Sequence, residues 1–340
     1  MRASEHFWSA RGAKPLWKKI PQKPSRRNFL VFRLVVTFAL FFALFKFIPY
    51  DKLIEIYGSS KKIYILFAFL VFFLCTFLGA IRWRFLLISL GLRISLREVL
   101  YSYFSGLFFN FFCPSFVAGD VFRGVGISKR HGEAKKVAAS ILMDRLSGAF
   151  ALVLVAIFSF IVGKGLFHTN HVFFSLILLC VIVGFTFLLI FSKTFFRFSI
   201  GILKKSSSLR GKLVSFHDQL YFFKNNSKVF IKNILFFSLP IQILVPFSFF
   251  LCSKAFGVET RIISFLILVP IITAIALIPL TIAGAGTREA ASVYFFSLVG
   301  IEKSIGLGIS LLNFAFLIFI GILGGILYVS VYHRWLQSRS

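Results

Sequence analysis

The chain has 340 residues, of which 58% are hydrophobic and only 15% are charged, and its formal net charge is +28. Soluble globular domains have about 45–50% apolar and about 25% charged residues, so this composition excludes that class. Several apolar stretches reach the roughly 20 residues that cross a bilayer as a helix. The composition therefore predicts an all-α fold, a polytopic transmembrane bundle of about seven or eight spans.

The Lys and Arg residues lie between the apolar stretches, not in a separate domain, and this placement argues against nucleic acid as a partner. The connections richest in Lys and Arg are residues 1–28, 82–98, 119–136 and 192–229. Cytoplasmic loops of membrane proteins carry such an excess. We expect a basic cytoplasmic N-terminal arm (1–28), a transmembrane domain (29–332) and a short basic tail (333–340), in a multi-pass protein of the cell membrane.

The apolar stretches predict the positions of the spans. In chain order they are Phe29–Ile48, Ile63–Ile81, Val137–Val162, Val172–Phe191, Phe230–Cys252, Ile262–Leu280, Thr287–Val299 and Ser304–Val329. The last of them is rich in glycine, which lets neighbouring membrane helices pack closely.

A further apolar stretch, Val99–Ala118, has basic residues on both flanks. One crossing would leave one of these basic flanks outside, against the positive-inside rule. The stretch also contains Asn110 and Pro114, which suit a broken element. We expect a re-entrant hairpin that enters from the cytoplasm and returns; the competing interpretation is a tilted ordinary span.

A second irregular region lies near the C-terminus, where Pro270 and Pro279 interrupt an apolar stretch and a glycine-rich turn follows. The short helix Thr287–Val299 comes next. If it crosses, both termini are cytoplasmic, and we favour this arrangement. If it is re-entrant, the C-terminus lies outside and the basic tail breaks the rule.

Charged residues at membrane depth are rare, because each one is expensive to keep in lipid. Three groups occur here: Asp120 with Arg123, Asp144 with Arg145, and Arg288 with Glu289. Adjacent residues on a helix point about 100° apart, so Asp144 and Arg145 each need a partner from another element. Glu289 is a candidate partner for Arg145. The alternative role for all three groups is an ion-pair network that only holds the bundle together.

The stretch AGAGTREA (283–290) carries the third group. Gly284 and Gly286 allow unusual backbone angles and a close approach. Thr287 can cap the helix that follows, whose free N–H groups favour an anion. Arg288 adds a planar fork that suits phosphate. The stretch is therefore predicted to end one helix and to begin another beside an anionic group.

Four motifs occur in order: RWR (82–84), FNFFCPSFVAGDVFR (109–123), DRLSG (144–148) and PLTIAGAGTREA (279–290). Together they resemble the transmembrane region of lysylphosphatidylglycerol synthases and the related stand-alone flippase-like membrane proteins. Ala118 and Ala283 stand where the family often has glycine, and Thr281 stands where serine is common. The resemblance covers nearly the whole chain.

The resemblance implies that the protein moves or handles a lipid with an anionic headgroup, either a phospholipid or a polyprenyl-phosphate-linked sugar. We expect a non-enzymatic lipid transporter without a cofactor or a metal, while membrane partner proteins and the oligomeric state stay open. The expected headgroup ligands are Asn110, Arg123, Arg145, Gly284, Gly286, Thr287 and Arg288, with Asp120, Asp144 and Glu289 balancing charge or carrying protons.

The alternative function is a membrane glycosyltransferase, or an assembly partner, in the synthesis of lipid-linked glycans. A transferase for nucleotide sugars usually holds a metal ion on an Asp-x-Asp pair, and the sequence contains no such pair.

Overall fold

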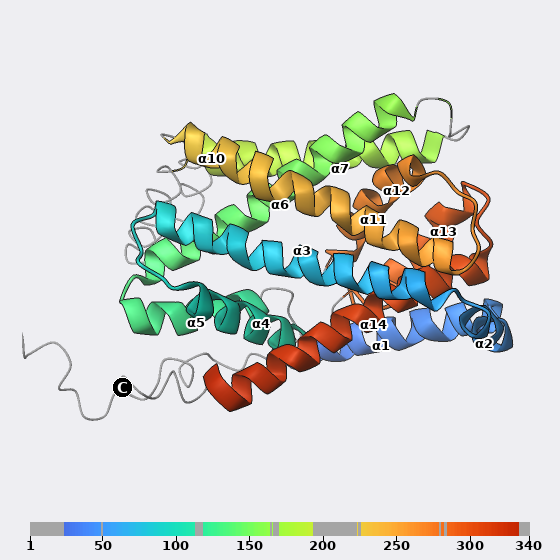
Figure 1. Ribbon diagram of the computed structural model, residues 1–340, viewed down its shortest axis with the longest axis horizontal. Coiled ribbons are helices and arrows are strands. Elements are labelled where there is room, and N and C mark those ends of the chain that lie inside the picture. The colour runs from blue at the N-terminus through green and yellow to red at the C-terminus, as the bar shows by residue number, and fades with distance from the viewer. Residues whose placement is uncertain are drawn as a thin grey trace, which may run out of the picture.

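The computed structural model describes residues 24–48, 50–112, 118–163, 165, 170–192, 223, 226–278, 280–281 and 284–332. The regular structure of these residues is helical, and they contain no strand (Figure 1). The helices are α1 (Pro24–Phe47), α2 (Tyr50–Gly58), α3 (Lys62–Ser89), α4 (Leu96–Phe112), α5 (Ala118–His131), α6 (Ala134–Val162), α7 (Asn170–Phe191), α10 (Ser227–Asn233), η2 (Ile234–Ser238), α11 (Leu239–Ala255), α12 (Ile262–Ala276), α13 (Thr287–Ser297), α14 (Lys303–Leu327) and η3 (Tyr328–Tyr332). The predicted all-α class is confirmed.

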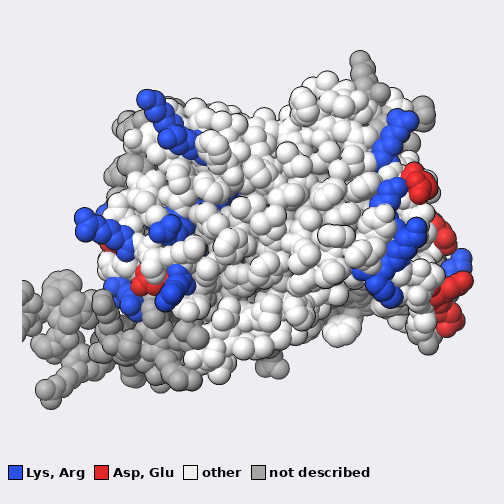
Figure 2. Space-filling model, in the orientation of Figure 1, with Lys and Arg blue, Asp and Glu red and all other residues white. Residues whose placement is uncertain are grey.

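Charged side chains gather at the two ends of the molecule, with an almost uncharged belt between them (Figure 2). The basic end lies where α3 and α5 finish, and it includes Arg93, Arg97, Lys129 and Arg130. The mixed end carries acids as well as cations, at α2 and at the start of α14. Large apolar side chains such as Phe158 are exposed on the belt. A belt of this kind matches the hydrocarbon core of a bilayer.

Five helices are long and apolar enough to cross a membrane: α3, α6, α7, the continuous helix Ser227–Ala255 and Lys303–Ser330. A pair formed by most of α1 and by α2, bent by 78°, makes a sixth if it counts as one span. The polytopic bundle is confirmed, but the predicted number of about seven or eight spans is too high for the described residues. The difference comes from α12, with 15 residues, and α13, with 11.

The stretch predicted to be re-entrant forms most of α4, which makes a hairpin with α5. Near the start of α4, the Glu98 carboxylate pairs with the Nε of Arg130, near the end of α5, at 3.0 Å. Farther along, a side chain on Gly119 would collide with the carbonyl oxygen of Gly106. Since both ends of the pair lie at the basic end and the helices touch along their length, the chain enters and returns. This structure supports the hairpin over the tilted span.

The favoured arrangement of the second irregular region is wrong. The ring centroids of Phe265, near the start of α12, and Phe296, near the end of α13, lie 5.2 Å apart. The two helices therefore form a second hairpin, with both of its ends at the mixed end (Figure 1). Neither helix crosses, because neither is long enough. The other arrangement considered above, in which α13 alone is re-entrant, is corrected as well. The re-entrant element consists of α12 and α13 together.

The two hairpins enter the bundle from opposite ends (Figure 1). Each is flanked by two long helices, α3 and α6 for the first and α11 and α14 for the second. At the centre, α3 and α11 lie side by side and antiparallel, and the Lys61 N–H before α3 donates to the Ala255 carbonyl that ends α11 at 2.9 Å. This is a span–hairpin–span unit repeated in inverted orientation.

Each hairpin packs on the other half as well as on its own. The first hairpin packs on α14, where a side chain on Gly324 would collide with the backbone of Phe104. The second packs on α6, where a Cβ on Gly163 would lie 2.9 Å from the Cδ1 of Ile267. The predicted close packing of the glycine-rich last span is confirmed at Gly324. Each hairpin thus contacts both halves of the bundle.

The inverted units also share a sequence pattern. Residues 114–123 read PSFVAGDVFR and residues 279–288 read PLTIAGAGTR. Pro, Ala, Gly and Arg occur at the same places in both, and Val in the first corresponds to Ile in the second. In each unit the arginine that ends the pattern lies on the returning helix of the hairpin, Arg123 in the second turn of α5 and Arg288 in the first turn of α13.

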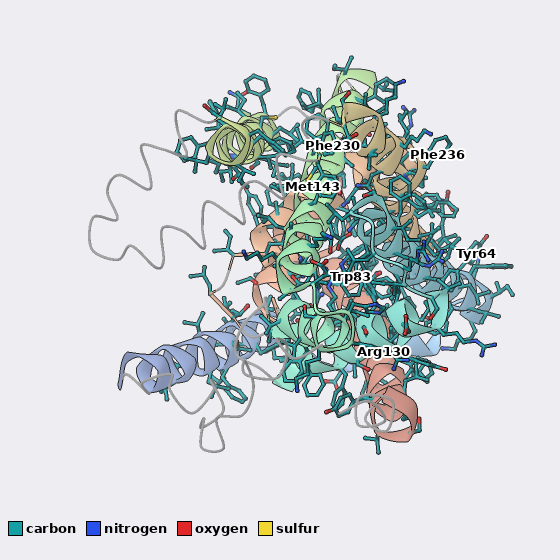
Figure 3. The ribbon with its side chains drawn as sticks, turned by 90° about the vertical axis from the view of Figure 1, so that its left-hand side faces the viewer. Tyr64, Trp83, Arg130, Met143, Phe230 and Phe236 are labelled. Atoms are coloured by element: carbon teal, nitrogen blue, oxygen red, sulfur yellow. The ribbon has the colours of Figure 1, made fainter. Side chains whose placement is uncertain are left out.

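Some predictions fall outside the described residues. These include the tail 333–340 and most of the basic arm 1–28, although α1 begins at Pro24, inside the predicted arm. The N-terminal half of α1 leans away from the bundle (Figure 3). The proposed boundaries of the three regions stay predictions.

Candidate functional site

Five charged side chains form a continuous chain of ion pairs inside the first half, here called the five-residue cluster: Arg82, Asp144, Arg123, Asp120 and Arg145. Arg82 Nε lies 2.6 Å from Asp144 Oδ1, and Arg123 Nη2 lies 2.9 Å from Asp144 Oδ2. The same Nη2 lies 2.9 Å from Asp120 Oδ1, and Arg145 Nε lies 2.8 Å from Asp120 Oδ2. The cluster joins α3, α5 and α6.

The prediction that Asp144 and Arg145 find partners on other elements is confirmed. Asp144 pairs with α3 and α5, and Arg145 pairs with α5. The suggested pair between Arg145 and Glu289 is wrong, because Asp120 reaches Arg145 and Glu289 has partners of its own. The two residues on α6 point in different directions, so each meets a different neighbour.

Arg123 is held between aromatic rings. Its guanidinium carbon lies 4.6 Å from the centroid of the Trp83 ring and 5.1 Å from that of Tyr103. Its Nε and Nη1 have no hydrogen-bond partner among the described residues. Aromatic faces attract a cation, and more strongly when water is excluded. Trp83 is fixed in turn by a 3.0 Å hydrogen bond from its Nε1 to Ser140 Oγ, and it lies deep in the bundle (Figure 3).

Arg82 is the functional candidate that the charge analysis missed. It was counted with the loop 82–98, because the predicted span ended at Ile81, but α3 continues to Ser89. Its side chain turns inward, where Gly148 makes room: a Cβ there would lie 3.2 Å from Arg82 Nη1. The RWR motif was the available signal. Arg82 Nη1 also lies 3.5 Å from Oγ of Ser238, at the end of the π-helical turn η2.

The five-residue cluster has three guanidinium groups and two carboxylates, so its formal charge is +1. Four of its members are buried, while the Arg145 side chain is 47% exposed. The positive charge is therefore accessible to a ligand at Arg145, whereas the guanidinium groups of Arg82 and Arg123 are buried. A buried cation and a buried carboxylate stabilise one another, whereas an exposed guanidinium can still donate hydrogen bonds to the anionic group of a ligand.

The third charged group forms a separate local cluster. Arg288 donates from Nε and Nη2 to Glu289 Oε1, at 3.1 and 3.0 Å. Ser310 Oγ, on α14, donates to the same oxygen at 3.3 Å. Arg288 also lies over the ring of Phe314, with 4.7 Å from the guanidinium carbon to the ring centroid. Glu289 is fully buried, so this cluster is closed and has no net charge.

The glycine-rich turn has the expected backbone and a different cap. Gly284 and Gly286 have φ angles of 72° and 90°, which favour glycine. Gly286, not Thr287, is the N-cap of α13, and its N–H donates to Glu289 Oε2 at 2.6 Å. Thr287 Oγ1 donates to the Gly284 carbonyl at 3.0 Å. The anion that this helix N-terminus was predicted to attract is thus provided, at Gly286, by the chain's own carboxylate.

Asn110, the remaining predicted ligand, joins the two helices of the first hairpin. Its Oδ1 accepts a hydrogen bond of 2.9 Å from the N–H of Gly119, at the start of α5. This bond satisfies a free N–H of the helix N-terminus. Asn110 therefore positions the returning helix that carries Asp120 and Arg123.

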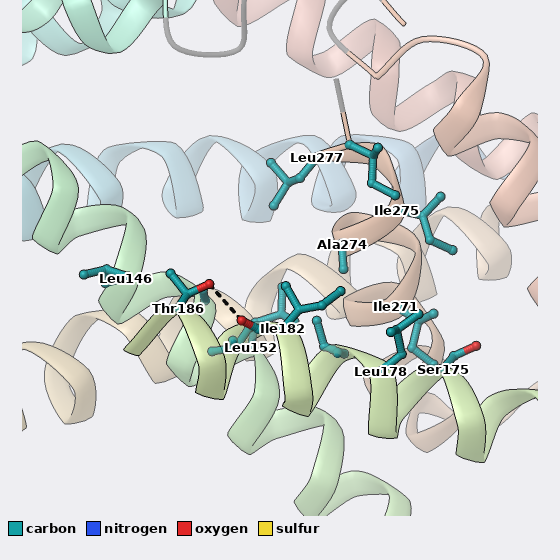
Figure 4. A pocket seen from close by; sticks show the side chains of 14 residues that line it. Leu146, Leu152, Ser175, Leu178, Ile182, Thr186, Ile271, Ala274, Ile275 and Leu277 are labelled. Carbon is teal, nitrogen blue, oxygen red and sulfur yellow. Dashed lines mark hydrogen bonds between the residues drawn. The ribbon is translucent and has the colours of Figure 1, made fainter. Parts of the chain in front are cut away.

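An apolar groove, here called the α6–α7–α12 groove, lies between these three helices (Figure 4), and one of its lining residues, Leu146, directly follows Arg145 of the five-residue cluster. It has a volume of about 440 Å³ and is lined mainly by aliphatic side chains, among them Leu146, Leu152, Leu178, Ile271 and Ala274. Sequence reasoning could not find it, because α12 is far along the chain from the other two walls, α6 and α7.

No group of His, Cys, Asp or Glu in the described part of the chain is arranged to hold a metal ion. Cys75, Cys180 and Cys252 are free thiols.

Comparison with known proteins agrees with this architecture. Residues 30–325 match the family described as "Lysylphosphatidylglycerol synthase TM region". The chain is 24% identical over 298 residues to the UPF0104 membrane protein MJ1595 of Methanocaldococcus jannaschii, and the match covers 82% of this chain and 88% of that protein. No solved structure matches. Since the family match covers most of the chain, the protein belongs to the lysylphosphatidylglycerol synthase transmembrane-region family of multi-pass membrane proteins.

Proposed function

We propose that the protein moves a lipid with an anionic headgroup across the membrane, without covalent chemistry. The observation that carries the proposal is the pair of hairpins that enter from opposite ends, each with a buried ion cluster on its returning helix. Many transporters are built from inverted repeats with broken helices, and their substrate sites lie where the repeats meet. Here each hairpin packs on both halves, so that a movement of one half against the other also moves the hairpins.

The polar part of the substrate meets Arg145. This residue supplies the exposed positive charge of the five-residue cluster, while the guanidinium groups of Arg82 and Arg123 are sealed in ion pairs. Arginine suits phosphate because its planar fork can donate two parallel hydrogen bonds. The headgroup is therefore proposed to be a phosphate ester, of a phospholipid or of a polyprenyl lipid.

The basic end is proposed to face the cytoplasm of the cell. With α1 as one span and both hairpins returning, the chain crosses six times, so both termini lie on the same side. The connections rich in Lys and Arg, 82–98 and 119–136, then lie on the cytoplasmic side too, as the positive-inside rule requires. In this arrangement the basic tail also lies on the cytoplasmic side. A re-entrant α13 alone would instead place the tail outside, against the positive-inside rule.

The test is lipid movement in proteoliposomes that contain a trace of phosphatidylglycerol with a fluorescent headgroup. A membrane-impermeant reductant quenches only the outer leaflet, so movement is seen as additional quenching. We expect it with the wild type and a loss of at least about tenfold with Arg145→Gln, equivalent to about 1.4 kcal/mol. Lys129→Gln removes an exposed cation at the basic end and is the matched control. Quenching equal to that of protein-free vesicles, for phosphatidylglycerol and for a polyprenyl phosphate, would overturn the proposal.

A further inference from the structure

We propose that the α6–α7–α12 groove is a binding site for a hydrocarbon chain of the lipid whose phosphate Arg145 contacts. The choice of ligand rests on the proposed function, while the site itself rests on the lining of the groove and on its position next to the cluster. The proposal commits the groove to one occupant, an acyl or polyprenyl chain of an anionic lipid.

The lining excludes a polar ligand. Apart from Ser175 and Thr186, the residues around the groove are aliphatic. Both hydroxyls are engaged with their own helix, since Ser175 donates to the His171 carbonyl and Thr186 to the Ile182 carbonyl, each at 2.8 Å (Figure 4). A volume of about 440 Å³ lies within the range of ligand sites. The groove therefore fits hydrocarbon and offers nothing to a headgroup.

The position of Arg145 supplies the headgroup contact. It precedes Leu146 by one residue and Ala149 by four, and both of these line the groove. Residues four apart lie on one face of a helix, so Arg145 extends the Ala149 face by one turn toward the basic end. Its side chain is 47% exposed there, and Asp120 holds its Nε. A lipid with its phosphate at Arg145 would have its chain next to the groove.

The α7 wall explains how a chain can enter. In the most apolar window of α7, 11% of the residues are buried, compared with 44% in α6. The outer face of α7, including Phe174, Val181 and Phe185, is exposed on the apolar belt. Because the groove lies along a helix that faces lipid, a chain reaches it sideways from the bilayer. No polar barrier has to be crossed.

The test is lipid binding to the purified protein, measured by native mass spectrometry with phosphatidylglycerol and phosphatidylcholine of identical chains. We expect the wild type to prefer phosphatidylglycerol. Ala274→Phe places a ring in the groove and should lower the binding of both lipids by at least about tenfold. Arg145→Gln should remove the preference and leave phosphatidylcholine binding intact. The controls are Val181→Phe, an exposed position of α7 outside the groove lining, and Lys129→Gln.

A second measurement uses the unaltered protein, in case Ala274→Phe does not fold. Phosphatidylglycerol with a photoreactive acyl chain should crosslink to residues 175–186 and 271–278. Crosslinks confined to other helices, or binding by folded Ala274→Phe equal to the wild type, would overturn the site. The two proposals fail separately: binding at the groove without lipid movement contradicts the transport function, and movement unaffected by Ala274→Phe contradicts the site.

Discussion

The Nη2 of Arg123 lies 2.9 Å from the Oδ2 of Asp144 and also 2.9 Å from the Oδ1 of Asp120. One guanidinium nitrogen thus joins the returning helix of the first hairpin to the long helix α6. Because Asp144 also binds Arg82 of α3, this carboxylate connects three elements at one point.

Removal of the Asp144 charge should be strongly destabilising. In Asp144→Asn, Arg82 and Arg123 keep their buried charges and lose a shared counter-ion. Breaking a buried ion pair from one side costs about 3–5 kcal/mol. The measurement is unfolding in detergent by denaturant titration. Glu133→Gln, which removes an exposed carboxylate just before the same helix, should change stability by less than about 1 kcal/mol. Equal stabilities of the two variants would contradict the role of Asp144.

The two arginines at the ends of the five-residue cluster should differ in their effect on stability. Arg82→Gln leaves part of the Asp144 charge uncompensated in the interior and should cost about 3 kcal/mol. Arg145→Gln affects a half-exposed pair and should cost less than about 1 kcal/mol. Thermal unfolding of both variants gives the comparison. If Arg145→Gln unfolds as readily as Arg82→Gln, Arg145 is needed to hold the fold together. A loss of lipid movement in Arg145→Gln would then not be evidence that Arg145 binds the headgroup.

The crossing of the first hairpin should not accept a side chain. Gly119→Ala brings a methyl group against the backbone of Gly106, where no flexible side chain can move away. Overpacking of this kind costs about 1–3 kcal/mol. Gly184→Ala, on α7, is the control, because nothing lies within 4 Å of its new methyl group. Alanine there should be neutral or stabilising by up to about 1 kcal/mol. A neutral Gly119→Ala would show that the helices are farther apart than described.

The cap of α13 should depend on the Glu289 charge. Glu289→Gln weakens the bond from the Gly286 N–H and leaves Arg288 without its counter-charge. Hydrogen bonds to charged groups contribute about 1.5–3 kcal/mol, so the loss should be about 2 kcal/mol. Hydrogen exchange of the first turn of α13 should rise together with the drop in melting temperature. Glu302→Gln, at an exposed position after α13, is the control. Unchanged exchange at Gly286 would refute the cap.

The first hairpin could be predicted, and the second could not, for a physical reason. Val99–Ala118 has basic residues on both sides. A single crossing would place one of these basic flanks outside the cell, against the positive-inside rule, so the sequence alone favours a return. The connections around α12 and α13 carry few charges of either kind. Only the basic tail favoured a crossing over a return, and helix length and contacts such as Phe265 with Phe296 decide for the return.

By itself, the sequence determined the all-α membrane class, most of the spans, the re-entrant first hairpin and the family, because apolar length, loop charge and local motifs are properties of neighbouring residues. The tertiary structure decided which charges meet. Arg82 and Asp144 are 62 residues apart, and the groove joins three helices from both halves. Such contacts depend on how the halves pack, since a buried charge binds whichever partner the packing brings within reach.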